Sequence, residues 1–433
     1  MRTKKTYQLT KIEPFKAQLL AWSQQFDTVL WLDSNNYSQQ YSNYDAVLAV
    51  EEFTSIKTDY LDAFNQLKEY QTLTKDWIFG YLTYDLKNDV EVLKSNNTSV
   101  LDFPELYFFQ PQKLFLIKGN TLEVQYLKMV DNEIESDFNT IFNFEIENKL
   151  DLENYGEKVK IKLTLTKDNY LERVKKVLNH IQRGDIYEAN FCQEFFAEDV
   201  EINPYTVYNK LNNISNPPFA SYFKHLNTYV MCASPERYLK KESDKLISQP
   251  IKGTAKRSAN KQEDELLKDT LENDAKERSE NVMIVDLVRN DLSKTAQKGS
   301  VNVEELCKIY SFDQVHQMIS TVVSKVKPEI HPVDIIKTTF PMGSMTGAPK
   351  ISAMQIIEDL EVSKRGLYSG AIGYFTPEND FDFNVVIRSI LYNKTKKYVS
   401  YSVGGAITVK SDPTKEYEEC LLKAKAMRQA LET

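Results

Sequence analysis

The sequence of 433 residues predicts an α+β fold, and two observations lead to this prediction. Segments with the length and composition of β-strands occur throughout the chain, with helical segments between some of them. The two kinds of segment do not alternate regularly, as they would in a parallel βαβ sheet. With 42% hydrophobic and 27% charged residues, the chain also has the composition of a globular protein with a large core.

The first 150 residues contain strands mixed with helices, together with all three tryptophans. The clearest predicted strands are the apolar runs at residues 28–33, 46–50 and 114–118. Residues 131–160 are polar and acidic with weak periodicity, which predicts a linker or a variable crossover. We therefore expect an N-terminal region at 1–150 and a second domain at 160–433, the two intertwined in one unit.

The second part of the chain begins with a well-marked helix. Thr166 is a suitable N-cap, apolar residues follow at helical spacing, and Gly184 is a suitable C-terminal cap. A strand is predicted at 186–195 and two helical segments at about 261–292. The last helix starts after Asp412, with proline at its first position, and runs almost to the end of the sequence.

The charge and the cysteine pattern exclude several classes of function. The net charge of −8 argues against nucleic acid as a partner. The longest apolar runs are far shorter than the ~20 residues of a membrane span, and no secretory signal is expected. The four cysteines stand far apart without a CxxC pair, which predicts reduced thiols in a cytoplasmic protein. With only four histidines, any metal is expected to be a hard cation held by carboxylates.

The first candidate for chemistry is Lys252, which lies in the segment Pro-Ile-Lys-Gly-Thr at 250–254. A lysine on such a tight loop is commonly a solvated turn residue, and this is the alternative to a catalytic role. A nucleophilic lysine must first lose its proton. At a pKa near 10.4 only about one in 2,500 is neutral at pH 7, which costs roughly 4.6 kcal/mol. Burial or a cationic neighbour would have to offset most of this cost, and Lys256 and Arg257 are near enough in sequence to contribute.

The second candidate is Glu236, in the segment Ser-Pro-Glu-Arg at 234–237 that follows an apolar strand. A glutamate that emerges from a buried strand is partly desolvated, which raises its pKa into the range used for proton transfer. An ion pair with adjacent basic groups is the alternative.

Two predicted helices carry acidic faces. Glu277 and Glu280 are three residues apart and precede an apolar run, so their helix is expected to enter the core. In the last helix Glu416, Glu419 and Lys423 share one face. Glu419 and Lys423 alone would form a surface pair worth ~0.2–0.5 kcal/mol, whereas carboxylates from both helices together would suit Mg²⁺.

Glycine-rich segments occur in the C-terminal half at residues 342–350, 366–375 and 403–407. Glycines at strand ends and helix starts present free N–H groups to an anion. The segments match neither a Walker loop nor a dinucleotide-binding loop. Between the last two segments, Arg388 emerges from an apolar strand, and a buried arginine needs an anionic partner, most naturally a carboxylate.

Taken in order, these segments resemble the chorismate-utilising enzymes, a family that includes the large subunit of anthranilate synthase, component I of aminodeoxychorismate synthase, and the isochorismate and salicylate synthases. The resemblance is strong over residues 165–430 and looser before them, where Gly-Tyr-Leu-Thr-Tyr-Asp at 80–85 is similar to the family. It implies two large, mainly antiparallel β-sheets packed orthogonally, with helices on the outside and a site near the C-terminal glycine segments.

Three positions place the chain within the family by resemblance. Lys252 is lysine as in aminodeoxychorismate synthases, where anthranilate synthases have alanine, and Asn281 stands where anthranilate synthases usually have histidine. At the position of Glu188, isochorismate-forming members have a lysine base, so this chain lacks their water-activating group. The resemblance implies an enzyme of the aminodeoxychorismate synthase type, making 4-amino-4-deoxychorismate for p-aminobenzoate and folate biosynthesis. Anthranilate synthase and a non-catalytic family member are the alternatives.

The resemblance also implies a role for each candidate residue. Lys252 would attack C2 of chorismate as the C4 hydroxyl leaves, Glu236 would protonate that hydroxyl, and ammonia would then attack C4 and displace the lysine. The implied Mg²⁺ ligands, which would hold the ring carboxylate through the metal, are Glu280 and Glu419, with Glu277 and Glu416 beside them or acting through water. The implied substrate contacts are Thr254, Ser344, Tyr368, Arg388, Gly404, Gly405, Ala406 and Lys423.

Within that set the resemblance separates several kinds of contact. Arg388 and Tyr368 would hold the pyruvyl carboxylate, assisted by the backbone N–H groups around residues 404–406. Lys423 would lie near the ring carboxylate and the metal. Thr254 and Ser344 would line the pocket.

One position departs from the family pattern, and one function is missing from the chain. Gln317 stands where most members have histidine near the reacting C4, and His316 is one residue away, which puts more weight on Glu236 for proton transfer. No glutaminase signature surrounds any of the four cysteines. A separate glutamine amidotransferase subunit is therefore expected to supply ammonia.

Overall fold

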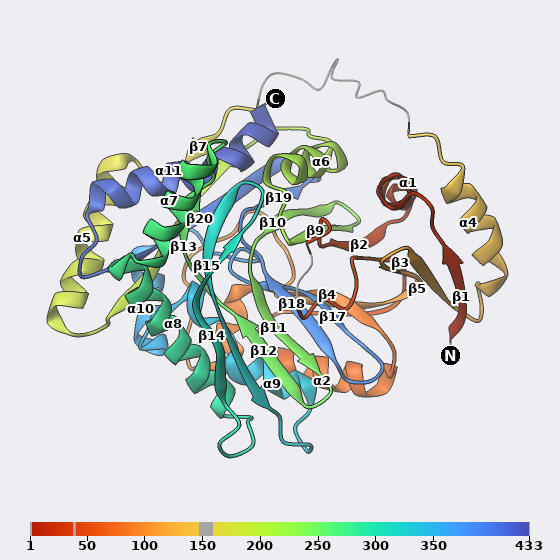
Figure 1. Ribbon diagram of the computed structural model, residues 1–433, viewed down its shortest axis with the longest axis horizontal. Coiled ribbons are helices and arrows are strands. Elements are labelled where there is room, and N and C mark those ends of the chain that lie inside the picture. The colour runs from red at the N-terminus through yellow and green to blue at the C-terminus, as the bar shows by residue number, and fades with distance from the viewer. Residues whose placement is uncertain (1, 38–39, 147–158, 433) are drawn as a thin grey trace.

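The computed structural model describes residues 2–37, 40–146 and 159–432. Every strand pairing in these residues is antiparallel, and the strands form one connected network. Helices surround the strands on the outside (Figure 1). The predicted α+β fold with large antiparallel sheets is therefore confirmed.

Two long strands, β3 (Ala46–Thr58) and β5 (Leu106–Lys118), connect the two parts of the network. The first half of β3 pairs with β2 and the second half of β5 with β6, whereas the first half of β5 pairs with β4. The pairing of β3 with β5 shifts register between Glu52 and Thr54, at the point where the two parts meet. The two sheets expected from the sequence are thus continuous through these strands.

The first sheet follows the order β8–β20–β19–β10–β9–β2–β3–β5–β6–β1, with β7 and β16 on β8. Besides β3 and β5, its strands are β1 (Arg2–Gln8), β2 (Thr28–Asp33), β6 (Thr121–Leu127), β7 (Lys162–Leu163), β8 (Glu188–Ala197), β9 (Phe219–His225), β10 (Thr228–Ser234), β16 (Gly347–Ala348), β19 (Ser389–Asn393) and β20 (Tyr398–Thr408).

The second sheet follows the order β5–β4–β17–β18–β11–β12–β15, and β13 and β14 also pair with β15. Its further strands are β4 (Ile78–Leu82), β11 (Arg237–Glu242), β12 (Lys245–Gln249), β13 (Ile251–Lys256), β14 (Asn302–Ser311), β15 (Val315–Lys325), β17 (Ala371–Phe375) and β18 (Phe381–Val385).

The alternation of side chains along the strands produces a layered core. In β2, Val29 and Trp31 belong to one apolar cluster, while Leu30 between them belongs to another. In β4, Phe79 shares this second cluster with Leu30, whereas Ile78 faces a third. Because successive strand residues point to opposite faces, the shared cluster is the core between the two sheets, and the other two lie beneath the outer helices.

The outer helices cover the other face of each sheet. The cluster on the first sheet includes residues of α1 (Ile12–Trp22), α4 (Ile134–Phe142), α5 (Lys167–Arg183), α6 (Pro204–Ser215), α10 (Lys350–Leu360) and α11 (Pro413–Glu432). The cluster on the second includes residues of α2 (Ala63–Thr74), α8 (Ala275–Ser293) and α9 (Pro332–Thr339). The remaining helical segments are α3 (Lys87–Val90), α7 (Lys261–Glu272), η1 (Ser23–Gln25), η2 (Tyr84–Leu86), η3 (Asp131–Glu133) and η4 (Gly343–Met345).

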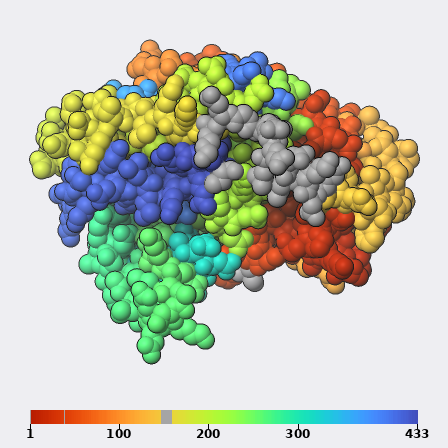
Figure 2. Space-filling model, turned by 90° about the horizontal axis from the view of Figure 1, so that it is seen from above, coloured from red at the N-terminus to blue at the C-terminus, as the bar shows by residue number. Residues whose placement is uncertain are grey.

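The helices predicted from capping residues form as expected. The Thr166 side chain accepts a hydrogen bond from the Asn169 N–H, and Gly184 ends α5 with a φ of 83°. The last helix, α11, begins at Pro413 as predicted and packs beside α5, which Figure 2 shows as blue against yellow. Both helices therefore follow from local signals as well as from their buried faces.

The prediction for residues 131–160 is partly wrong. Residues 134–142 form α4, because Ile134 and Ile141 are fully buried against the first sheet. The rest of the expected linker falls mainly at 147–158, outside the described residues. Strands of the first 150 residues pair with later ones, β2 with β9 and β4 with β17. The boundary between the two expected regions stays a prediction.

Candidate active site

Lys252 lies on β13 and forms an ion pair with a buried carboxylate. Its Nζ is 2.9 Å from Oε1 of Glu188, the first residue of β8. The side chains of Lys252 and Glu188 are 12% and 1% exposed. A solvated turn lysine would be open to water, so the structure excludes that interpretation.

The surroundings of Lys252 favour its protonated form. Burial lowers the pKa of Lys252, but the charges of Glu188, Glu280 and Glu236 outweigh burial and raise the pKa above its ordinary value of 10.5. The cationic neighbours expected from the sequence are not there. Arg257 pairs with Asp264 at 2.8 Å, and Lys256 is exposed. This expectation was wrong because Lys256 lies four residues further along β13 with its side chain in solvent, and Arg257, beyond the strand, is held by Asp264 of α7.

Glu236 follows β10 and is 4% exposed. Its Oε1 accepts a hydrogen bond of 2.7 Å from the hydroxyl of Ser344, which lies in η4. Burial raises the pKa of Glu236 to about 7, against the opposing effects of Ser344 and Lys252. Arg237 does not pair with it but binds Asp382 at 3.0 Å. The alternative of a local ion pair is therefore wrong, and a carboxyl group that can exchange a proton near neutral pH remains.

The strand β15 places Gln317 and His316 on opposite faces. Gln317 is buried opposite Thr254, and its side-chain oxygen has no hydrogen-bond partner among the described residues. His316 instead contacts Asp264 at 3.1 Å through Nε2, away from Lys252. Thr254 itself is exposed. The histidine next to Gln317 therefore does not replace the one that the family pattern places there.

Acidic residues of α8 and α11 share one lysine. The Nζ of Lys276 lies 3.7 Å from Glu280 and 3.9 Å from Glu416. Burial raises the pKa of Glu280 to about 7, and it also raises the pKa of Glu416, whose Oε1 accepts a hydrogen bond from Ser411. Two carboxylates that are costly to ionise thus converge on a single cation.

The other two predicted metal ligands lie at the edges of this group. A methyl group at Gly253 would lie 3.1 Å from Oε2 of Glu277, whose pKa is raised by burial. Glu419 forms a half-exposed i,i+4 pair with Lys423 at 2.7 Å, as the surface-pair alternative predicts. Burial raises the pKa of Glu419, but the ammonium of Lys423 outweighs burial, and the pKa of Glu419 is lowered overall. Within the described residues, no three His, Cys, Asp or Glu side chains are gathered as a ready-made metal site.

The edge of β20 that points away from β8 carries backbone N–H groups predicted to contact the substrate. The carbonyl of Gly404 accepts a hydrogen bond of 3.1 Å from Lys423, so Gly404 directs its N–H to the same side, away from β8. Alternation along the strand gives the N–H of Ala406 this direction too, whereas Gly405 faces β8. A methyl group at Gly404 would lie 2.5 Å from both Asn190 Oδ1 and Cys192 Sγ, and 3.1 Å from the Tyr368 hydroxyl. A side chain at this position would have to displace Asn190 and Cys192.

Arg388 is partly buried next to the strand that leads to Glu236. Its carbonyl accepts a hydrogen bond of 3.1 Å from the Ala233 N–H, and its backbone has a φ of 50°. Burial lowers the pKa of Arg388, and in the described part of the chain its guanidinium has no hydrogen bond or ion pair. An arginine with five unpaired donors is a site for an anion.

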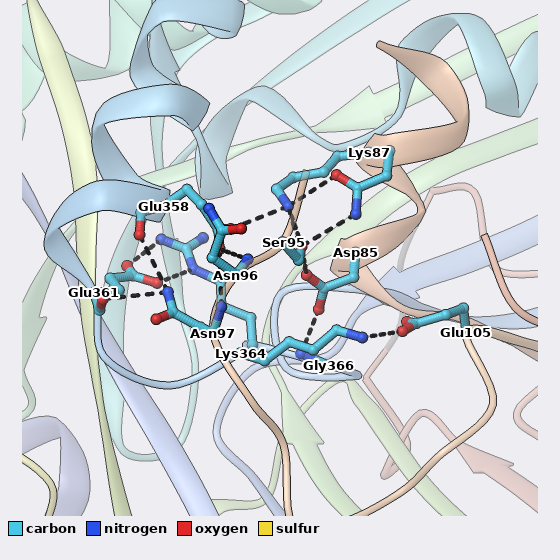
Figure 3. A network of polar contacts seen from close by, with 12 residues as sticks. Asp85, Lys87, Ser95, Asn96, Asn97, Glu105, Glu358, Glu361, Lys364 and Gly366 are labelled. Carbon is cyan, nitrogen blue, oxygen red and sulfur yellow. Dashed lines mark hydrogen bonds and ion pairs between the residues drawn. The ribbon is translucent and has the colours of Figure 1, made fainter. Parts of the chain in front are cut away.

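A polar network holds the segment that leads to Tyr368 (Figure 3). The Gly366 N–H donates to the carboxylate of Asp85 at 2.8 Å, and this carboxylate also accepts a hydrogen bond of 2.7 Å from Ser95. Lys87 lies between Asp85 and Glu358, at 3.5 and 3.2 Å. The network connects the segment after β4 with the end of α10.

A buried arginine completes this support. Arg365 forms an ion pair of 2.6 Å with Glu361 and donates hydrogen bonds to the carbonyls of Met345 and Asn190. Asn190 in turn donates to the Ser344 carbonyl at 3.1 Å. The segments that carry Glu188, Ser344 and Tyr368 are therefore fixed relative to one another.

Sequence reasoning missed two partners within the site. The sequence drew attention to Glu188 only because isochorismate-forming members have a lysine at this position. A glutamate in an apolar strand nevertheless needs a cationic partner, just as a buried arginine such as Arg388 needs an anionic one. Lys276 stands four residues before Glu280, a spacing that predicts contact in a helix. Its second contact, with Glu416, comes from tertiary packing of α8 near α11 and has no local signal.

Comparison with known proteins identifies the family. Residues 27–429 match the family of chorismate binding enzymes. A probable chloroplastic aminodeoxychorismate synthase of Oryza sativa is 33% identical over 402 residues, and the match covers 84% of this chain and 44% of the relative. Aminodeoxychorismate synthase component 1 of Bacillus subtilis is 33% identical over 366 residues, 82% of this chain and 76% of the relative.

The fold agrees with this assignment. The crystal structure of anthranilate synthase component I from Streptococcus pneumoniae superposes with a TM-score of 0.78 at 24% identity, over 90% of this chain and 93% of that one. The chain therefore belongs to the chorismate-binding enzyme family, although it spans less than half the length of the rice relative. No helix in the described part of the chain is long and apolar enough to cross a lipid bilayer.

Proposed function

We propose that the protein acts as component I of aminodeoxychorismate synthase, converting chorismate and ammonia to 4-amino-4-deoxychorismate for p-aminobenzoate and folate biosynthesis. One observation supports this most strongly: Lys252 is surrounded by buried carboxylates, among them Glu236, whose pKa of about 7 lets it hold a proton at neutral pH. An amine nucleophile and a nearby acid are the pair that displacement of a hydroxyl group requires. The names of the rice and Bacillus relatives agree with this proposal.

The reaction proceeds in two displacements. In the first, the neutral amine of Lys252 bonds to C2 of chorismate, both ring double bonds shift by one position towards C4, and the C4–O bond breaks. Glu236 gives its proton to the departing oxygen, which leaves as water. In the second, ammonia bonds to C4, both double bonds shift back, and the bond between C2 and Nζ breaks. The amino group then stands at C4.

The two carboxylates of chorismate require cationic or N–H partners. Arg388 has no partner among the described residues and would bind the pyruvyl carboxylate, together with the Tyr368 hydroxyl and the outward N–H groups of Gly404 and Ala406. Lys423 contacts the same edge and would lie near the ring carboxylate. Ser344 positions Glu236 by donating a hydrogen bond to its carboxyl group.

The carboxylates of α8 and α11 fit a magnesium ion in their chemistry. All four predicted ligands offer hard oxygen donors, and Glu280 and Glu416 already share one cation, the ammonium of Lys276. We propose that Glu277, Glu280, Glu416 and Glu419 hold Mg²⁺ directly or through water. A bound Mg²⁺ would supply positive charge for the ring carboxylate.

Ammonia is proposed to come from a glutamine amidotransferase subunit. All four cysteines are buried and free. Burial raises the pKa of Cys192 to about 12 and that of Cys232 and Cys420 to about 11, and it also raises the pKa of Cys307. A glutaminase nucleophile has to be a thiolate. Buried reduced thiols also fit our proposal that the protein works in the cytoplasm.

A coupled assay tests the proposed function. The protein is incubated with chorismate, Mg²⁺ and an ammonium salt, and aminodeoxychorismate lyase is then added. We expect p-aminobenzoate after the lyase and none before it. Formation of anthranilate without the lyase would assign the chain to the anthranilate synthase reaction instead, and absence of both products would contradict either activity.

A further inference from the structure

We propose that Glu188 is the general base that takes the proton of Lys252, and so a catalytic residue of the reaction; this inference rests on the proposed function. A nucleophilic amine must be neutral, yet the ion pair with Glu188 keeps Lys252 as an ammonium. The proton has to move to an acceptor once chorismate covers the pocket. Within the described residues, Glu188 is the acceptor in hydrogen-bond contact with Nζ, at 2.9 Å.

The environment of Glu188 makes this transfer feasible. The side chain is 1% exposed, and its second oxygen, Oε2, is buried without a hydrogen-bond partner among the described residues. A buried charged oxygen without a partner costs free energy, and among the described residues the contact with Lys252 is what compensates the charge of this carboxylate. Transfer along the existing hydrogen bond from Nζ to Oε1 turns a buried ion pair into two neutral groups. Such a change is favoured as water leaves the pocket.

The other carboxylates near the Lys252–Glu188 ion pair are not placed to accept the proton of Lys252. Glu236 has to hold its own proton for the departing hydroxyl, and its contact is with Ser344 rather than with Nζ. Glu280 acts on Lys252 through its charge and lies within 4 Å of Lys276. The more distant charges of Glu277 and Glu419 also act on Lys252 without a hydrogen bond to it.

The proton and electron balance closes over the cycle. The Nζ–H bond breaks, an O–H bond forms on Glu188, and the electron pair left on Nζ makes the bond to C2. The C4–O bond breaks, and its oxygen leaves as water with the proton of Glu236. When ammonia attacks C4, the C2–Nζ bond breaks and Lys252 leaves as a neutral amine. It recovers its proton from Glu188, while Glu236 is reprotonated from solvent.

The test measures formation of the covalent adduct on Lys252 in single turnover without ammonia, by rapid quench and mass spectrometry. The variant is Glu188→Gln, which keeps the shape of the side chain and removes its basicity. If Glu188 is the base, the adduct forms about 10²–10⁴-fold more slowly at pH 7. The rate recovers as the pH rises, because Lys252 then loses its proton to solvent before chorismate binds.

A purely positioning role for Glu188 predicts the opposite change in the rate of adduct formation. If Glu188 only held Lys252 in place, its removal would make neutral Lys252 more abundant, and the adduct would form as fast or faster at pH 7. That result would overturn the inference. Glu188→Asp keeps a carboxylate one methylene further from Nζ and is expected to react faster than Glu188→Gln; an aspartate variant no faster than the glutamine variant would also contradict the role.

Controls separate this inference from the function on which it rests. Glu194→Gln changes a partly buried carboxylate on the same strand that accepts a hydrogen bond from Tyr398 at 3.2 Å, and its adduct rate should equal that of the unmodified protein. If the unmodified protein forms no adduct, the proposed function fails. If it forms the adduct and Glu188→Gln matches it, only the role of Glu188 fails.

Discussion

Replacing Glu236 by glutamine should make the protein more stable and less active at the same time. The pKa of Glu236 is about 7 in the folded protein, against an ordinary value of 4.5. Because the folded-state pKa is the higher one, the folded protein binds this proton more tightly than the unfolded chain does. Glu236 therefore destabilises the fold increasingly as the pH rises from about 4.5 to 7, and the penalty levels off above that range.

The size of the effect follows from the two pKa values. Between pH 5 and pH 8 the penalty grows by about 2–3 kcal/mol, since each tenfold difference in proton affinity corresponds to about 1.4 kcal/mol. Glu236→Gln has no charge to bury. Its stability relative to the unmodified protein should therefore increase by that amount between pH 5 and pH 8, while the amination rate falls about 10²–10⁴-fold because the amide cannot act as an acid.

Urea unfolding at pH 5, 6, 7 and 8 in the presence of a chelator measures the first effect. Glu172→Gln on α5 is the control, because that carboxylate is exposed and its pKa is lowered by Lys176. The control should show no gain in stability towards pH 8. A difference between Glu236→Gln and the unmodified protein that stays constant over this range would refute the reasoning.

Three further predictions concern the sites proposed for the substrate carboxylates and for Mg²⁺. Gly404→Ala should cost about 1–3 kcal/mol of stability and weaken chorismate binding in calorimetry, because its methyl group meets Asn190; Gly405→Ala, whose methyl group would lie 3.3 Å from Oε2 of Glu416, should be milder. Arg388→Met should raise the Kd for chorismate about 10- to 100-fold while raising the urea midpoint, since it removes a partly buried charge that has no partner in the described part of the chain. Lys276→Gln should bind Mg²⁺ more tightly in titration calorimetry, since the cation that neutralises its two carboxylate neighbours is gone; equal or weaker binding would contradict a shared site.

Much of the fold could be predicted because its signals are local. Thr166 and Gly184 define α5 by their own backbone preferences, and the apolar runs become strands where they were expected. The helix α4 could not be predicted, because its two buried isoleucines stand in a polar and acidic segment and are fixed by the first sheet. The continuity of the sheets through β3 and β5 is likewise a matter of long-range pairing.

The candidate site shows the same division. The buried position of Glu236 follows from the apolar strand before it, so its raised pKa could be predicted. The surroundings of Lys252 could not, because Glu188 lies 64 residues away in sequence and its contact exists only in the folded protein. The sequence pointed to cationic neighbours that would lower the pKa of Lys252, and the structure instead provides carboxylates that raise it.

The central claim is that Lys252 bonds covalently to chorismate before ammonia arrives. The most direct measurement is mass spectrometry of the protein after incubation with chorismate and Mg²⁺ in the absence of ammonia, followed by proteolysis to locate the modification. The account predicts a gain equal to chorismate less one water, located on Lys252, that disappears when an ammonium salt is added. A protein that forms 4-amino-4-deoxychorismate but never carries this adduct, or carries it on another residue, would contradict the account.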